Sequence, residues 1–327
     1  MRIGVIGAGS LGHHHVRLLR EVPGARLVGF HELRPERARQ VSGELDVTAL
    51  STLEGLLDQV DAVTVVVPTV AHHAVAKAAL ERGKHVMIEK PIAATLDEAD
   101  DLLAAAKRNG ALIQTGHVER FNRAIRGALP YIDGPRFIES DRLAPFNPRG
   151  ADVAVVLDLM IHDIDLVRTL VGGHVDDLQA VGVPVLTPSV DIANARLSFD
   201  TGAVANITAS RVSRERLRKI RIFQRTGYLS LDLGAGSGEF YRLRTDVDFS
   251  QIAKAPLALE AFVERVVLDA EEGEPLRLEL ESFVAAVQGR ASVVVSGADG
   301  REALAVALRI NREIERTLPS LAGAGRA

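Results

Sequence analysis

The chain has 327 residues, which is too long for one small core and fits two domains of ordinary size. Its net charge of −4 argues against nonspecific nucleic-acid binding, and the lack of cysteine excludes disulfides, thiolate nucleophiles and cysteine-based zinc sites. The chain shows no signal-peptide pattern and no apolar run near the ~20 residues of a membrane helix, so we expect a cytoplasmic protein without membrane contact.

The first elements predict a dinucleotide site. A strand over residues 3–6 runs into Gly7-Ala8-Gly9-Ser10-Leu11-Gly12, and a helix over residues 11–20 follows. In this G-x-G-x-x-G setting Gly7 makes the tight turn, Gly9 lets the backbone approach a pyrophosphate, and Gly12 lets helix and strand pack. Ser10 and Leu11 lie where the helix start supplies amide donors. The alternative is a glycine turn that serves packing alone.

A second strand over residues 25–30 leads to Glu32, placed to accept hydrogen bonds from an adenosine ribose. Its carboxylate would repel a 2′-phosphate, which favours NAD. Arg34 lies close enough in sequence to accommodate that phosphate, so NADP stays open.

Strands and helices keep alternating as far as residue 116. The expected strands cover residues 46–49, 62–67, 85–88 and 111–114, and the expected helices cover residues 35–42, 52–58, 72–82 and 96–109. Gly43 is expected to stop the first of these helices, and Thr95 with Glu98 to form a capping box at the start of the last. This alternation predicts a doubly wound parallel sheet of the Rossmann type over residues 1–119.

Two strand ends carry polar groups. Pro68-Thr69 ends the 62–67 strand and brings His72 near the start of the next helix, where it either touches the cofactor or is an ordinary helix-surface histidine. Glu89-Lys90-Pro91 ends the 85–88 strand, and ligands of open parallel sheets bind beyond the carboxyl ends of strands. The alternative for this tripeptide is a solvated charge pair, and the sequence does not decide whether the proline is cis.

The order of predicted elements changes after residue 119, where the regular alternation of strands and helices ends. We expect a strand over 137–141, a strongly apolar helix over 152–171, two hairpins over 192–209 and 217–233, and helices over 276–288 and 300–317. The tail from residue 318 is expected to be loose. Consecutive hairpins predict an α+β domain over residues 120–327, with an open, mostly antiparallel sheet covered by helices on one side.

The apolar helix contains Asp158, His162, Asp163 and Asp165. Asp158 and His162 are four residues apart and share a helix face, so the carboxylate is placed to orient the imidazole as a general base. A salt-bridged helix and a metal site are the alternatives. Metal is the weaker one, because no third ligand with suitable spacing is evident.

Seven basic residues lie between Arg211 and Arg225. Most are expected on a solvated face, but one or two arginines would suit an anionic substrate group such as a diphosphate.

The motifs together resemble the Gfo/Idh/MocA oxidoreductases over nearly the whole chain. The matching pieces are the glycine motif, Pro68 with His72, Glu89-Lys90-Pro91, the segment Gly116-His117-Val118-Glu119-Arg120-Phe121, and Asp158 with His162. Two positions depart from the family pattern: Arg123 replaces a common proline, and Glu32 replaces the more frequent aspartate.

The resemblance implies a Rossmann domain followed by an open sheet whose face often forms the contact between subunits, here a homodimer or homotetramer. It implies that Lys90, Asp158 and His162 line the site, with His162 the usual acid/base and Lys90 binding the reacting oxygen. Some family members rely on the lysine instead. By the same resemblance His117 belongs to the cofactor site, and Arg120 and Arg211 to the substrate site.

Four segments are most similar to family members that oxidise C3 of UDP-N-acetylglucosamine: residues 116–122, 142–146, 156–166 and 208–213. We therefore expect NAD-dependent hydride transfer from a sugar carbinol, most simply the 3-hydroxyl of a UDP-N-acetylhexosamine. The alternatives are a dehydrogenase of inositol or a simple sugar, and a noncatalytic NAD-binding sensor. Intact Lys90, Asp158 and His162 argue against the sensor.

Overall fold

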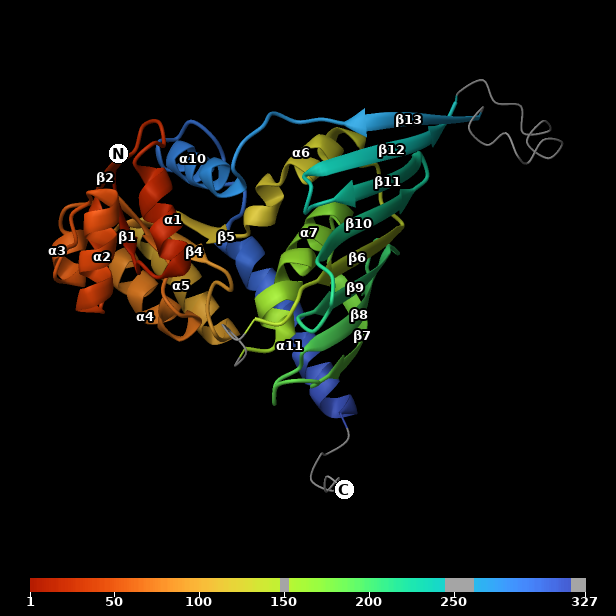
Figure 1. Ribbon diagram of the computed structural model, residues 1–327, viewed down its shortest axis with the longest axis horizontal. Coiled ribbons are helices and arrows are strands. Elements are labelled where there is room, and N and C mark those ends of the chain that lie inside the picture. The colour runs from red at the N-terminus through yellow and green to blue at the C-terminus, as the bar shows by residue number, and fades with distance from the viewer. Residues whose placement is uncertain (148–152, 245–261, 319–327) are drawn as a thin grey trace. The chain divides into compact units, whose positions relative to one another are not determined.

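The computed structural model describes residues 1–147, 153–244 and 262–318 (Figure 1). The chain forms two compact units, residues 1–121 with 273–305 and residues 122–272 with 306–327. The predicted division at residue 119 lies two residues from the first of these boundaries. It does not anticipate that residues 273–305 return to the first unit.

The first unit is built on a five-stranded sheet in which every neighbouring pair of strands is parallel. In spatial order its strands are β2 Arg26–His31, β1 Arg2–Ile6, β3 Ala62–Val65, β4 His85–Glu89 and β5 Ile113–Gly116. Its helices are α1 Ser10–Leu19, α2 Pro35–Leu45, α3 Leu53–Leu57, α4 Thr69–Leu80, α5 Leu96–Asn109, α10 Pro275–Val287 and the 3₁₀ turn η1 Val118–Phe121. The predicted doubly wound parallel sheet is confirmed.

Two local predictions in this unit are wrong. Helix α2 runs through Gly43 and ends at Leu45, and its C-cap is Asp46, a left-handed residue with φ 51°. Gly43 faces open space, and glycine in an exposed helix interior costs only about 1 kcal/mol, so the helix continues past it. Residues 46–49 form only a single bridge, between Phe30 and Ala49, because the chain leaves the sheet edge after it. The strand before Lys90 is therefore the fourth along the chain, not the fifth.

The predicted capping box at the start of α5 is confirmed, and capping residues also set other helix ends. Thr95 and Glu98 form a reciprocal capping box at the start of α5, and left-handed Gly110 ends that helix. Thr52 accepts a hydrogen bond from the backbone of Gly55 at the start of α3. These positions satisfy backbone donors and acceptors that a helix end leaves open.

The core of the first unit explains why residues 273–305 return to it. Leu280, Phe283 and Val284 of α10 are fully buried in one cluster with Val16 and Leu19 of α1. An amphipathic helix gains most of its stability from burying such a face. Because α10 covers α1, it belongs to the dinucleotide-binding unit although it lies far along the chain.

The second unit is built on an eight-stranded sheet that is mostly antiparallel, as predicted. In spatial order its strands are β13 Val263–Leu268, β12 Ser237–Leu243, β11 Gly227–Asp232, β10 Leu217–Gln224, β6 Phe137–Leu143, β9 Val204–Ser210, β8 Ile192–Phe199 and β7 Val175–Val183. Only β6 and β9 run parallel among the paired strands. Strands β7, β12 and β13 are not among the predicted strands; they lie towards the edges of the sheet, where few residues are fully buried.

Helices cover one face of this second sheet (Figure 1). They are α6 Arg123–Ala128, α7 Ile161–Val171 and the last part of α11 Gly297–Thr317, with the short turns η2 Leu129–Tyr131 and η3 Val156–Met160. The predicted helix over 152–171 is interrupted, because η3 is a π-helical turn that passes into α7. Residue 152, where that prediction begins, and the tail 319–327 lie outside the described residues.

None of the helices in the described ranges combines the length and apolarity needed to span a membrane.

Candidate functional site

A cleft with a volume of about 770 Å³ lies at the carboxyl ends of strands β1, β3 and β4. All predicted cofactor residues except His117 line it: Gly7, Gly9, Ser10, Leu11, Gly12, Glu32, Arg34, Pro68, Thr69, His72, Glu89 and Lys90. His117 is buried just after β5 and does not line the cleft. The parallel topology brings these strand ends to one edge of the sheet, which is where such folds bind ligands.

The surroundings of the three motif glycines differ, so each position is occupied by glycine for its own reason. Gly7 has a φ of +90°, and a Cβ there would lie 2.4 Å from the carbonyl oxygen of Val66. A Cβ on Gly12 would lie 2.0 Å from the carbonyl oxygen of Gly7, so this glycine lets α1 approach β1. A Cβ on Gly9 would meet no protein atom closer than Arg34 Nη2 at 3.8 Å. Packing therefore does not require Gly9, and the space above it suits a ligand.

The start of α1 is open to a ligand. Gly9 is its N-cap and has no side chain to occupy the first amide groups. Arg37 binds the loop from outside: its Nε donates to the carbonyl oxygen of Ala8 at 2.9 Å, and its Nη2 to that of Gly9 at 3.1 Å. Because a trans peptide directs C=O and the following N–H to opposite sides, this clamp turns the amides of Gly9 and Ser10 away from Arg37. Arg37 was not among the predicted site residues, because no sequence motif marks it.

Glu32 is anchored at the end of β2. Its carboxylate accepts from the backbone N–H of Ala8 at 3.0 Å and from Nε of Arg34 at 3.0 Å. Burial acts to raise the pKa of Glu32, but the hydrogen bonds from Arg34 and Ala8 outweigh it, so that pKa lies below its ordinary value. The carboxylate is charged at neutral pH and keeps lone pairs for ribose hydroxyls.

His72 is a buried residue that joins two loops of the cleft. Its Nδ1 lies 2.8 Å from the carbonyl oxygen of Pro91 and its Nε2 lies 2.9 Å from that of Val67. Burial lowers the pKa of His72, and this effect outweighs the two hydrogen bonds, which act to raise it. The imidazole thereby fixes the segment that follows Lys90, and the Lys90–Pro91 peptide is cis.

Glu89 lies behind Lys90 and faces helix α1. Its Oε1 is 3.1 Å from Nε2 of His15, and both side chains are almost fully buried. Glu89 was predicted at the cofactor site from its place at a strand end, whereas no sequence feature marks His15.

In the second unit, Asp158 lies on the π-helical turn η3 and His162 on the first turn of α7. Both side chains are partly exposed, whereas the neighbouring Asp163 is buried. Arg142 of β6 donates to Asp163 from Nε at 2.6 Å and from Nη2 at 3.1 Å, and Ser140 donates at 3.0 Å. This ion pair fixes α7 on the sheet. π-Turns are frequent at functional sites, and their wider turn makes the expected four-residue spacing an imperfect guide.

The two predicted substrate arginines are engaged inside their own units. Nη1 of Arg120 donates to the carbonyl oxygen of Val294 at 3.2 Å. Arg211 is buried, with Nε 3.6 Å from Asp191 and Nη2 bonded to the carbonyl oxygens of Val153 and Val190. The guanidinium of Arg211 thus holds segments of its own unit together, and the substrate roles of Arg120 and Arg211 stay predictions.

Among the described residues, no group of three or more histidine, aspartate or glutamate side chains is arranged to hold a metal ion.

Both units match known protein families. Residues 1–117 match the model "Oxidoreductase family, NAD-binding Rossmann fold", and residues 136–230 match the "GFO/IDH/MocA C-terminal domain". A UDP-N-acetylglucosamine 3-dehydrogenase of Acidithiobacillus ferrooxidans is 37% identical over 97% of this chain and 98% of its own length. Its solved structure matches with a TM-score of 0.89 at 36% identity, over 97% of this chain and 98% of that one. A scyllo-inositol 2-dehydrogenase (NAD(+)) of Bacillus subtilis is 32% identical over 65% of this chain and 68% of its own.

Proposed function

Because the chain belongs to the Gfo/Idh/MocA family of NAD-binding oxidoreductases, we propose that it oxidises the 3-hydroxyl of a UDP-N-acetylhexosamine. The observation that supports this substrate best is the similarity to the UDP-N-acetylglucosamine 3-dehydrogenase over nearly the full length of both chains.

The residues of the cleft fit a dinucleotide, because the open space above Gly9 and the uncapped start of α1 suit a pyrophosphate. When bound, NAD accepts the hydride that leaves the carbinol carbon. The amides of Gly9 and Ser10 bind the pyrophosphate, and Glu32 accepts hydrogen bonds from the adenosine ribose. The anionic Glu32, paired with Arg34, favours NAD over NADP.

Three side chains handle the substrate hydroxyl in this proposal. His162 takes the hydroxyl proton, and Asp158 orients its imidazole. The ammonium of Lys90 stabilises the alkoxide that develops on the oxygen, an interaction stronger in the transition state than in the ground state.

One observation favours a second candidate, a dehydrogenase of a free polyol such as inositol. A diphosphate substrate calls for arginines at the site, yet Arg211 is buried and paired with Asp191. The other arginines of the 211–225 run are exposed. A free polyol needs no such contact.

The deciding experiment incubates the purified protein with NAD and either UDP-N-acetylglucosamine or myo-inositol. We expect the near-ultraviolet absorbance of reduced nicotinamide to rise with the nucleotide sugar, and mass spectrometry to find a product lighter by one hydride and one proton. Turnover of myo-inositol alone would replace the proposal by the polyol candidate. Stable NAD binding without turnover of any sugar would support a noncatalytic sensor.

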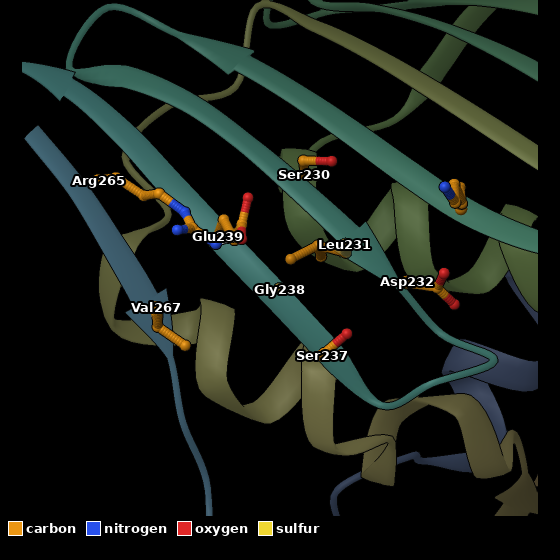
Figure 2. A pocket seen from close by; sticks show the side chains of 9 residues that line it. Ser230, Leu231, Asp232, Ser237, Gly238, Glu239, Arg265 and Val267 are labelled. Atoms are coloured by element: carbon orange, nitrogen blue, oxygen red, sulfur yellow. Dashed lines mark hydrogen bonds and ion pairs between the residues drawn. The ribbon is translucent and has the colours of Figure 1, made fainter. Parts of the chain in front are cut away.

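We also propose that the open face of the second sheet binds the same face of another copy of this chain. Phe137, Phe223, Tyr228 and Tyr241 stack across β6, β10, β11 and β12 on this face. A neighbouring hollow has a volume of about 220 Å³ and is lined by Glu239, Arg265 and Val267 among others. Figure 2 shows that Arg265 reaches towards Glu239, with which it forms an ion pair, and that Val267 lies on the same strand. Stacked aromatics flanked by paired charges are typical of protein interfaces.

A further inference from the structure

A buried pair of ionisable side chains lies behind the lysine of the cleft. His15 is on the second turn of α1, the helix that begins at the glycine motif, and Glu89 is the last residue of β4. Their side chains are 0% and 10% exposed, and Nε2 of His15 lies 3.1 Å from Oε1 of Glu89. The pair therefore connects the cofactor helix to the strand that ends at Lys90.

The two carboxylate oxygens of Glu89 have different partners. Oε1 faces His15, and Oε2 accepts a hydrogen bond from the backbone N–H of Lys90 at 3.3 Å. Burial acts to raise the pKa of Glu89, but the His15 hydrogen bond and the nearby positive charges outweigh it, so the pKa lies below its ordinary value. Glu89 is an anion that touches the backbone of the lysine and attracts its ammonium.

The neighbouring strand is shaped around this carboxylate. Gly116 of β5 pairs with Glu89, and a Cβ on Gly116 would lie 2.9 Å from the carboxylate carbon and 3.0 Å from each oxygen. The φ of Gly116 is not positive, so backbone conformation does not demand glycine there. Glycine is needed at position 116 because the Glu89 carboxylate occupies the space that a side chain there would take.

Packing does not account for the pair. A buried carboxylate and a buried imidazole cost solvation energy that two apolar side chains of the same volume would not. Nδ1 of His15 is buried without a hydrogen-bond partner among the described residues.

We propose that His15 is a positioning residue for Lys90, acting through Glu89. Its imidazole holds the carboxylate in one orientation, and the carboxylate fixes the backbone and the charge of the lysine. This inference rests on the proposed function of Lys90. His72 is the other titratable group whose charge Glu89 influences, and it holds the same loop from the far side, at Pro91.

The test compares His15→Leu, which removes the hydrogen bond, with His15→Gln, which keeps a donor, and with His14→Leu as the matched control on the same helix. We expect His15→Leu to lower kcat about 10- to 100-fold, because small displacements of a reacting group have such effects. His15→Gln should recover most of the loss, and His14→Leu should match the wild type. The Kd for NAD, from calorimetry, should stay near wild type in all three.

A second measurement needs no substrate. Without the His15 hydrogen bond, the Glu89 carboxylate no longer holds the backbone of Lys90 in one arrangement, so an amine-reactive reagent should label the less firmly held Lys90 several-fold faster. Glu89→Gln should act in the same direction. Exposed Lys107 is the internal standard in mass spectrometry.

The outcomes separate the two proposals. Normal kcat and unchanged Lys90 labelling in a folded His15→Leu protein would overturn the positioning role, as would a His15→Gln protein as impaired as His15→Leu. Normal turnover in Lys90→Ala would instead overturn the proposed function of the lysine. If His15→Leu does not fold, His15→Gln and Glu89→Gln decide by the labelling rate.

Discussion

At the scale of single residues, the glycine motif separates folding from binding. Gly12 has no room for a side chain because of Gly7, whereas Gly9 has room in the protein and is open towards the cleft. The same residue type is thus needed for helix–strand packing at one position and for access to a phosphate at the other.

The corresponding substitutions should behave differently. Gly9→Ala should keep the wild-type melting temperature but weaken NAD binding about tenfold or more, because the new methyl occupies the space above the helix start. Gly12→Ala should lower the melting temperature, because its Cβ overlaps the Gly7 carbonyl. Thermal unfolding and NAD titration check both. A strongly destabilised Gly9→Ala protein would contradict this assignment.

Lys90 and His162 are the residues on which the proposed chemistry depends. We expect Lys90→Ala and His162→Ala each to lower turnover about 100-fold or more while NAD still binds, since neither is needed at the glycine turn. Steady-state kinetics and calorimetric titration with NAD measure the two effects. Near-normal turnover in both variants would refute the proposed mechanism.

At the scale of elements, buried carboxylates fix segments that periodicity alone leaves undetermined. Asp163 ties α7 to β6 through Arg142, and Asp191 organises the loop after β7. The Asp191 carboxylate accepts from the backbone N–H groups of Val185, Leu186 and Thr187 at 2.7–2.9 Å. These pairings join residues far apart in the chain or lie within a single loop, so the periodicity of the sequence does not predict them.

Asp191 gives a pH-dependent prediction. Burial acts to raise its pKa, but the hydrogen bonds from Thr187 and Leu186 outweigh it, so the pKa lies below its ordinary value. The stabilisation is fully present above the unfolded pKa and is lost as pH falls through the lower folded pKa. Asp191→Asn should therefore cost about 2 kcal/mol at pH 7, and the difference should shrink below about pH 4. Urea unfolding at several pH values measures this, and a pH-independent difference would contradict it.

At the scale of the whole molecule, helices cover one face of the second sheet and leave the other face open in the described part of the chain (Figure 1). Its outward side chains alternate with buried ones along β6 and β10, so one face packs on helices and the other is left accessible. We therefore propose that a second copy of the chain covers this face, since aromatic side chains such as those stacked on it are enriched at protein interfaces.

Substitution at the centre of this face tests the association. Phe223 lies between Phe137 and Tyr228 in the aromatic stack. Phe223→Asp should shift the protein to a smaller species in size-exclusion chromatography with light scattering, because a buried unpaired charge opposes association. Exposed Arg20→Asp of the first unit is the control and should leave the mass unchanged. A monomeric wild-type protein would contradict the proposal.

The sequence by itself determined the local features. It specified the glycine turn, the capping box at Thr95, the strand–helix alternation and the two central hairpins, because each depends on nearby residues and their periodicity. The same locality explains the prediction of Lys90 at a strand end. Two predictions made from local composition were wrong. Helix α2 continues through Gly43 because that residue faces open space, and residues 46–49 form one bridge at the sheet edge and no full strand.

Only the tertiary structure decided which distant groups meet. It placed α10 against α1, paired His15 with Glu89 across 74 residues, and buried Arg211 beside Asp191. These pairings depend on how parallel strands and their helices stack, and sequence spacing contains no record of that. The motif residues were predictable because they bind a ligand locally, and their supporting partners were not, because packing selects them from anywhere in the chain.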